Sequence, residues 1–149
     1  MAERTTLDRV AFVREWYEAM PEELTAIRED PSLGAKSIEV LTAVADPDFE
    51  TVLAGGRYSV ARGFRGVDGY SRAWGDWLEA WESYRSPVEG YLEGRDCVLV
   101  LAIQQGVPRG GSTAVESEAA AVWFFEGDRL TRIEFHLDRA AGLEAAGLA

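Results

Sequence analysis

The spacing of apolar residues predicts two long helices. Over residues 7–20 and 67–81, apolar side chains recur every three or four positions, which is the period of one buried helix face. Thr5 or Thr6 can cap the first helix. The second carries the tryptophans at 74, 77 and 81 on one face, and we expect them in the core rather than in a cofactor site.

Two shorter helices are expected at residues 38–45, capped by Ser37, and at residues 139–146, capped by Asp138. Gly147 can close the last helix in a left-handed conformation. Residues 21–36 lie between the first two helices and combine prolines and a glycine with acidic side chains. They predict a helical turn and a loop with few apolar anchors.

The apolar period changes to that of strands in the second half of the chain. A first strand is expected at residues 49–53, before a turn at Gly55 and Gly56. Further strands are expected at residues 88–92, 97–105, 113–125 and 129–137, with turn residues between them. Hairpin connections favour an antiparallel sheet. The predicted class is α+β, with the helices on one face of a curved sheet.

Composition narrows the classes of partner. The 149 residues fit a single domain, residues 1–149, and carry 26 acidic against 15 basic side chains, a net charge of −11. Such a charge disfavours nucleic acid and anionic membranes as partners. Cys97 has no second cysteine to pair with, and the charged first ten residues do not resemble a signal peptide. We therefore expect a cytoplasmic protein.

Four segments carry a resemblance to a known family: GFRGVDGY at 63–70, WLEAW at 77–81, VWFFEGDRL at 122–130 and FHLDRAAGLEAAGL at 135–148. From residue 38 onward the chain resembles the SnoaL-like, polyketide-cyclase-like branch of the nuclear transport factor 2-like superfamily. The longer link at residues 21–36 departs from the family pattern and can reshape or cover the mouth of a pocket.

The resemblance implies a cystatin-like cone, in which a bent sheet wraps around the N-terminal helices and encloses a mostly apolar pocket. It implies a homodimer formed through the convex face and an apolar or aromatic small molecule as ligand, with no cofactor and no metal. The side chains expected to line the pocket are Trp16, Tyr17, Trp74 and Trp123.

Family members include cyclases, isomerases, epoxide hydrolases and dehydratases, and their catalytic residues transfer poorly. The catalytic tyrosine of the isomerases falls at Trp16, and their general base falls near Thr51 or Val52, which cannot act as a base. The dehydratases use more than one histidine, and this chain has only His136. The cyclases resemble it best, because Asp138 is the nearest match to their acid/base aspartate.

His136 is the first catalytic candidate. A two-residue turn before residue 129 would place Glu134, His136 and Asp138 on one face with Ala121 and Trp123. There His136 would act as a general acid or base beside Glu134 or Asp138. In the alternative, this face meets water or a second subunit, and Asp138 only caps the last helix.

Glu118 is the second candidate, because the same register places it on the apolar face, where a desolvated carboxylate suits proton transfer. At the open end of its strand, Glu118 can instead reach water. Two functions follow: a cofactor-free cyclase or isomerase, or a non-catalytic ligand-binding or scaffold protein whose own tryptophans fill the pocket. An open cavity containing an ionisable group would favour the first.

Overall fold

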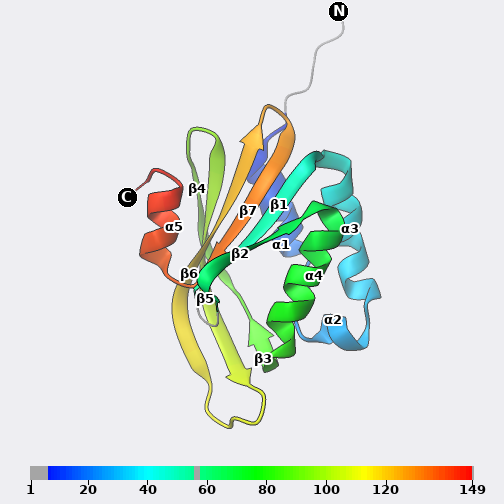
Figure 1. Ribbon diagram of the computed structural model, residues 1–149, viewed down its shortest axis with the longest axis vertical. Helices are drawn as coiled ribbons and strands as arrows, with labels where there is room; N and C mark the ends of the chain where they lie inside the picture. Colours follow the sequence, from blue (N-terminus) through cyan, green and yellow to red (C-terminus); the bar gives the residue numbers. More distant parts are fainter. Residues whose placement is uncertain (1–6, 56–57, 149) are drawn as a thin grey trace, which may run out of the picture.

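The computed structural model describes residues 7–55 and 58–148 as a curved sheet with helices on both faces (Figure 1). In chain order the elements are α1 (Arg9–Glu18), α2 (Ala26–Glu29), α3 (Ser32–Val44), β1 (Ala45–Gly55), β2 (Tyr58–Arg65), α4 (Gly66–Glu79), β3 (Trp81–Arg85), β4 (Val88–Glu93), β5 (Cys97–Pro108), β6 (Val115–Glu126), β7 (Arg129–His136) and α5 (Arg139–Ala145). The predicted α+β class is confirmed.

The strands form one sheet in the order β2-β1-β7-β6-β5-β3, and β4 also pairs with β5. The hairpin pairs β5–β6 and β6–β7 are antiparallel, as their turns predict. However, β1 runs parallel to β7, so the sheet is mixed rather than wholly antiparallel. This pair places the first strand of the chain beside the last, inside the sheet.

The sequence patterns do not predict two of the strands, β2 and β3. The strand β2 is an edge strand that pairs only with β1, and Gly63 within it interrupts the alternation. The strand β3 begins at Trp81, which the helical stripe had assigned to α4. The helix α4 ends at Glu79, so Trp81 follows the strand period instead.

The starts of two helices differ from expectation. Asp8 caps α1 by accepting a hydrogen bond from the Ala11 amide at 3.0 Å, while Thr5 and Thr6 lie outside the described residues. The helix α3 begins at Ser32, six residues before the predicted start at residue 38. Pro31 occupies its N-cap position, where proline starts a helix because it needs no N–H partner there.

The helices divide between the two faces of the sheet. Phe12, Val13 and Trp16 of α1 pack on the concave face, against Trp123 of β6 and the core around it. The helix α5 packs on the convex face, over Cys97, Leu99, Ala120 and Val122. Figure 1 shows α5 on the other side of the sheet from α3 and α4. The expectation that all helices share one face is therefore wrong for α5.

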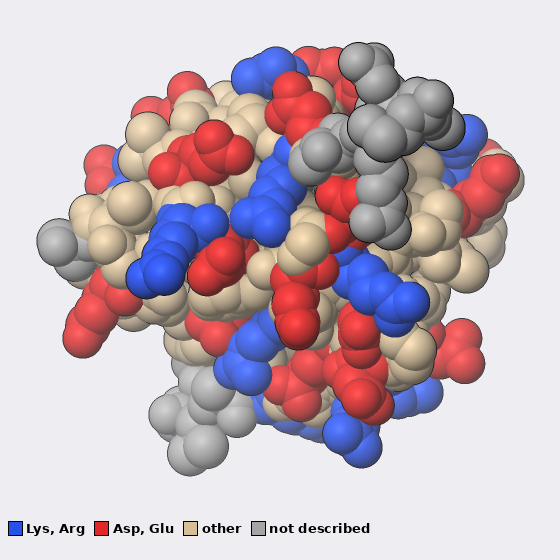
Figure 2. Space-filling view, turned by 90° about the horizontal axis from the view of Figure 1, so that it is seen from above, with Lys and Arg blue, Asp and Glu red and all other residues tan. Residues whose placement is uncertain are grey.

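Basic and acidic side chains are interspersed on the face seen in Figure 2. Several pair across neighbouring elements, as Arg129 does with Asp46 at 3.5 Å. Among the described helices, none has the length and apolar character needed to cross a bilayer.

Candidate functional site

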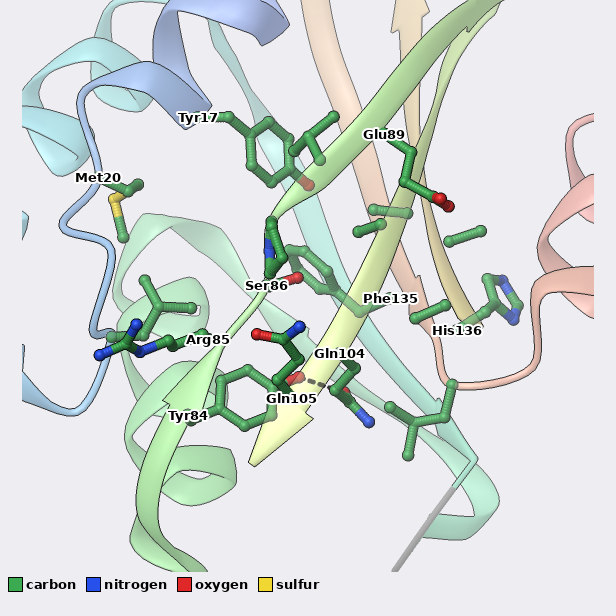
Figure 3. A pocket seen from close by; sticks show the side chains of 18 of the residues that line it. Tyr17, Met20, Tyr84, Arg85, Ser86, Glu89, Gln104, Gln105, Phe135 and His136 are labelled. Carbon is green, nitrogen blue, oxygen red and sulfur yellow. Dashed lines mark hydrogen bonds between the residues drawn. The ribbon is translucent and has the colours of Figure 1, made fainter. Parts of the chain in front are cut away.

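A cavity of about 540 Å³ opens on the concave side of the sheet, lined by side chains of α1, α4 and strands β1 and β3 to β7 (Figure 3). Most of its wall is apolar or aromatic and includes Met20, Leu53, Trp74, Trp77, Phe135 and Leu137. The charged side chains that reach it are all exposed: Arg14, Glu18, Glu22, Arg85 and Glu89. The charged residues therefore mark the mouth, and the apolar residues mark the interior.

The segment that joins α1 to α2 forms one wall of the cavity through Pro21, Glu22 and Leu24. Leu24 is 7% exposed and packs in one cluster with Trp77 and Tyr84. Its amide also donates to the Tyr84 carbonyl at 2.9 Å. The expectation of few anchors in this segment is therefore wrong, since a buried leucine and a backbone hydrogen bond attach it to β3.

Glu23 fastens the same segment to β3. Its carboxylate accepts hydrogen bonds from the Ser83 hydroxyl, from the Tyr84 amide at 2.9 Å, and from the hydroxyl and amide of Thr25. Burial acts to raise the pKa of Glu23, but these hydrogen bonds outweigh it and lower the pKa to about 2. The charged form of Glu23 therefore holds this wall of the cavity in place.

Trp16, Tyr17 and Trp74, which the sequence suggested as ligand-binding residues, all line the cavity. Trp123 is fully buried and lies behind Tyr17, where its indole Nε1 donates to the Tyr17 hydroxyl at 3.3 Å. Burial raises the pKa of Tyr17, so its hydroxyl stays protonated. Figure 3 shows that hydroxyl directed into the cavity.

A second buried polar group lies deeper in the cavity, and the sequence patterns did not single it out. Gln104 of β5 is 6% exposed, and its amide oxygen accepts a hydrogen bond from the Tyr84 hydroxyl (Figure 3). Trp77 donates to that same hydroxyl. The signal that could have identified Gln104 is its position: it is a polar residue on the inward-facing side of the strand, two positions after Ala102 and four after Val100.

A bulge in the last hairpin changes which residues of β7 face the cavity. The turn itself is as expected, with Glu126 opposite Arg129, but Phe125 pairs with Leu130 and Phe124 with Arg132. Thr131 is the extra residue, and its hydroxyl donates to the Phe124 carbonyl at 3.2 Å. The predicted pairing of faces is therefore wrong by one residue.

In the observed register, His136 pairs with Ala120 on the convex side, while Phe135 pairs with Ala121 on the concave side. His136 is among the residues that line the cavity, but Figure 3 shows its ring at the edge, across β7 from Phe135. Its side chain is 13% exposed. The ring lies neither in bulk solvent nor in the apolar interior.

Charged residues accompany His136 along β7. Its Nε2 lies 2.8 Å from the Glu134 carboxylate, which also accepts from Arg132 at 2.6 Å, and Arg132 reaches Glu50 of β1 at 3.2 Å. The hydrogen bond with His136 lowers the pKa of Glu134, burial opposes this, and Arg132 adds to the lowering. An ionised Glu134 only accepts hydrogen bonds, so Nε2 of His136 donates to it.

The two other catalytic candidates lie outside the cavity. Asp138 caps α5, because its carboxylate accepts from the Ala140 amide at 3.1 Å, as the sequence predicted. Glu118 is on the convex face with its side chain 69% exposed, 3.6 Å from Arg139. The desolvated position expected for Glu118 is therefore not found.

Arg139 occupies the space beside the small residues of β5 and β6. Its guanidinium donates to the backbone carbonyls of Ala119 at 3.3 Å and Ala102 at 2.9 Å, and to Glu89 of β4 at 2.5 Å. These bonds tie α5 to three strands next to the mouth of the cavity.

No cluster of three metal-ligating side chains occurs within residues 7–55 and 58–148.

No family model and no curated protein matches the sequence. Solved structures do match. An NTF2-like protein from Burkholderia thailandensis shares 20% identity at a TM-score of 0.65, with 97% of this chain and 98% of that chain covered. The fold is that of the NTF2-like proteins.

Two further structural neighbours are described by an activity or by a bound molecule. A candidate SnoaL-like polyketide cyclase from a Jannaschia species shares 16% identity at a TM-score of 0.59, with 99% of each chain covered. TerC, crystallised with polyporic acid, shares 18% identity at a TM-score of 0.63, with 93% of this chain and 98% of that chain covered. Identities this low show the NTF2-like fold, the same fold that the sequence resemblance implied, and leave the chemistry open.

Proposed function

We propose that this protein binds an apolar or aromatic small molecule in the cavity between α1, α4 and the concave face of the sheet. The observation that carries the proposal is an apolar cavity of about 540 Å³ with charged residues only at its mouth. Ligand sites of this size combine an apolar wall with a few polar groups, and Tyr17 and Gln104 supply those groups. A neighbour of the same fold, TerC, was crystallised with polyporic acid.

A simple aromatic hydrocarbon tests the proposal, because it needs only the apolar wall. Fluorene is titrated into the protein, and binding is followed by quenching of the tryptophans at 16, 74 and 77, which line the cavity. Saturable quenching is expected in the parent. Ala121 lines the cavity at its floor, so Ala121→Leu should weaken fluorene binding while the circular dichroism spectrum stays that of the parent. No saturable binding, or equal binding by parent and variant, would refute the proposal.

A second candidate function is a cofactor-free acid/base conversion of the bound molecule, such as an isomerisation or a cyclisation. The observation that favours it is the pair formed by His136 and Glu134, because a carboxylate on Nε2 leaves the lone pair of Nδ1 to accept a proton. His136 also lines the cavity. The base would abstract a proton next to a carbonyl group of the ligand.

Exchange of the α-protons of 2-tetralone in D₂O, followed by proton NMR, measures this activity without knowledge of the natural substrate. The parent is expected to exceed the buffer rate, and His136→Gln is expected to return to the buffer rate with its fold unchanged. Asp138→Asn serves as the control that keeps the rate, since asparagine can still cap α5. A parent rate equal to that of buffer would exclude this role for His136.

A further inference from the structure

The hydrogen bonds around the cavity have a fixed direction. Indole nitrogen only donates, so the bond between Trp123 and Tyr17 uses a lone pair of the Tyr17 hydroxyl. The hydroxyl proton of Tyr17 must therefore point elsewhere, and no acceptor within the described residues takes it. In Figure 3 the hydroxyl faces the cavity, so its proton is available to a bound molecule.

A second set of hydrogen bonds, which joins Trp77, Tyr84 and Gln104, has the same direction, from an indole N–H towards the cavity. Trp77 donates to the Tyr84 hydroxyl, which leaves that hydroxyl to donate to Gln104. This fixes the orientation of the Gln104 amide, because its oxygen is the acceptor and its nitrogen must lie on the other side. One N–H of that nitrogen reaches the Ser117 hydroxyl at a long 3.4 Å. The other N–H has no acceptor among the described residues.

Each set of hydrogen bonds therefore begins at an indole N–H, of Trp123 or of Trp77. The first set ends at the Tyr17 hydroxyl and the second at the Gln104 amide, and both of these groups can donate to a ligand. The carboxylates of Glu18, Glu22 and Glu89 are exposed at the mouth, whereas the less exposed acceptors of the lining are Ser86, Gln105 and His136. A buried polar group that stays unpaired weakens binding, so a ligand gains affinity by bringing acceptors to these donors. A hydrocarbon of the same shape brings no acceptor and would leave both donors unpaired.

We propose that Tyr17 and Gln104 are the specificity-determining residues of the cavity, and that they select a ring-shaped ketone over the matching hydrocarbon. The inference rests on the proposed binding function and adds the chemical class of the ligand. Carbonyl oxygen accepts from the Tyr17 hydroxyl, from the Gln104 amide, or from both. Trp123, which does not line the cavity, is a positioning residue that sets the direction of the Tyr17 donor. Trp77 sets the direction of the Tyr84 hydroxyl and also lines the cavity.

Three molecules of one shape test the inference: 9-fluorenone, 9-fluorenol and fluorene. Their dissociation constants are measured by quenching of tryptophan fluorescence. The parent is expected to bind fluorenone roughly five- to tenfold more tightly than fluorene, with fluorenol, whose oxygen also accepts, tighter than fluorene. Tyr17→Phe removes only the hydroxyl, so it should reduce the preference for fluorenone over fluorene while fluorene binding stays within about twofold of the parent.

Tyr70→Phe is the matched control. Tyr70 is a buried tyrosine, 3% exposed, that does not line the cavity, so its loss should leave the preference unchanged. Gln104→Met provides a second variant that should reduce the preference even where Tyr17→Phe fails to fold. Equal affinity of the parent for all three molecules would overturn this inference and leave the binding proposal standing. Absence of binding by all three would overturn both.

Discussion

Glu23 offers a test of how the cavity wall is held. Glu23→Gln keeps the shape of the side chain but removes the charge, and a glutamine has one accepting oxygen in place of two. The carboxylate accepts from Ser83, Thr25 and Tyr84, and Arg85 lies 3.6 Å away. At neutral pH the variant therefore lacks the charged acceptor at residue 23, and its hydrogen bonds to Ser83 and Tyr84 of β3 are weakened or lost.

The size of the effect follows from the pKa of Glu23. A fall from 4.5 to about 2 corresponds to about 3 kcal/mol of folding free energy for a fully transmitted interaction. The side chain is 32% exposed, so solvent screening reduces this to about 1–2 kcal/mol. For a chain of this length, the midpoint of thermal unfolding should drop by about 3–8 °C.

The pH dependence of unfolding tests whether the ionised form of Glu23 stabilises the fold. Because the folded-state pKa is lowered, the stabilisation by Glu23 is fully present above about pH 4.5 and is lost as the pH falls towards about 2. Denaturant unfolding of parent and variant, followed by circular dichroism, should show a difference at pH 7 that shrinks progressively below pH 4.5.

The neighbouring Glu22→Gln is the control. Its side chain is 84% exposed and pairs only with Arg85 among the described residues, so stability should change by less than about 0.5 kcal/mol. A difference between Glu23→Gln and the parent that is absent at pH 7, or that stays constant down to pH 2.5, would refute the account of the wall.

Three further predictions concern packing, capping and assembly. Gly106→Ala should destabilise the protein by about 1–3 kcal/mol in denaturant unfolding, because the new methyl group would lie 2.5 Å from the Trp81 ring; Gly75→Ala, in an open helix position, should not destabilise it. Asp138→Ala should cost about 0.5–2 kcal/mol and Asp138→Asn much less, and equal losses would contradict capping as the role of Asp138. Sedimentation at high micromolar concentration should show a homodimer formed through the convex face, which α5 covers only in part; a monomer alone would rule this out.

Local signals account for the parts of the fold that the sequence predicts. The stripe of α4 and the cap of α5 by Asp138 depend on residues within a few positions of each other. Gly147 has a φ of 73°, and the Leu148 amide bonds to the Leu143 carbonyl at 2.9 Å, which is the expected helix end. Such features need no knowledge of distant contacts, which is why the sequence alone predicts them.

Features that depend on distant partners were missed. Gly63 interrupts the strand pattern of β2, and its close neighbour is distant in sequence: a methyl group at this position would lie 3.1 Å from the Glu50 side chain on β1, which would have to shift. The anchoring of Leu24 requires the aromatic rings of Trp77 and Tyr84. For the same reason, sequence reasoning named Tyr17 and Trp123 but did not connect them, since 106 positions separate the two residues.

The bulge at Thr131 means that β7 contains two possible linings for the cavity. With the bulge, Ile133, Phe135 and Leu137 face inward, Arg132 and Glu134 face outward, and His136 reaches only the edge of the cavity. Without it, every residue from Arg132 onward would change sides, because side chains alternate along a strand. Over evolution, the loss of one residue from β7 would replace the apolar lining by an ionisable one, although no lining residue is substituted. A single insertion or deletion in this strand would therefore move ionisable side chains into or out of the cavity.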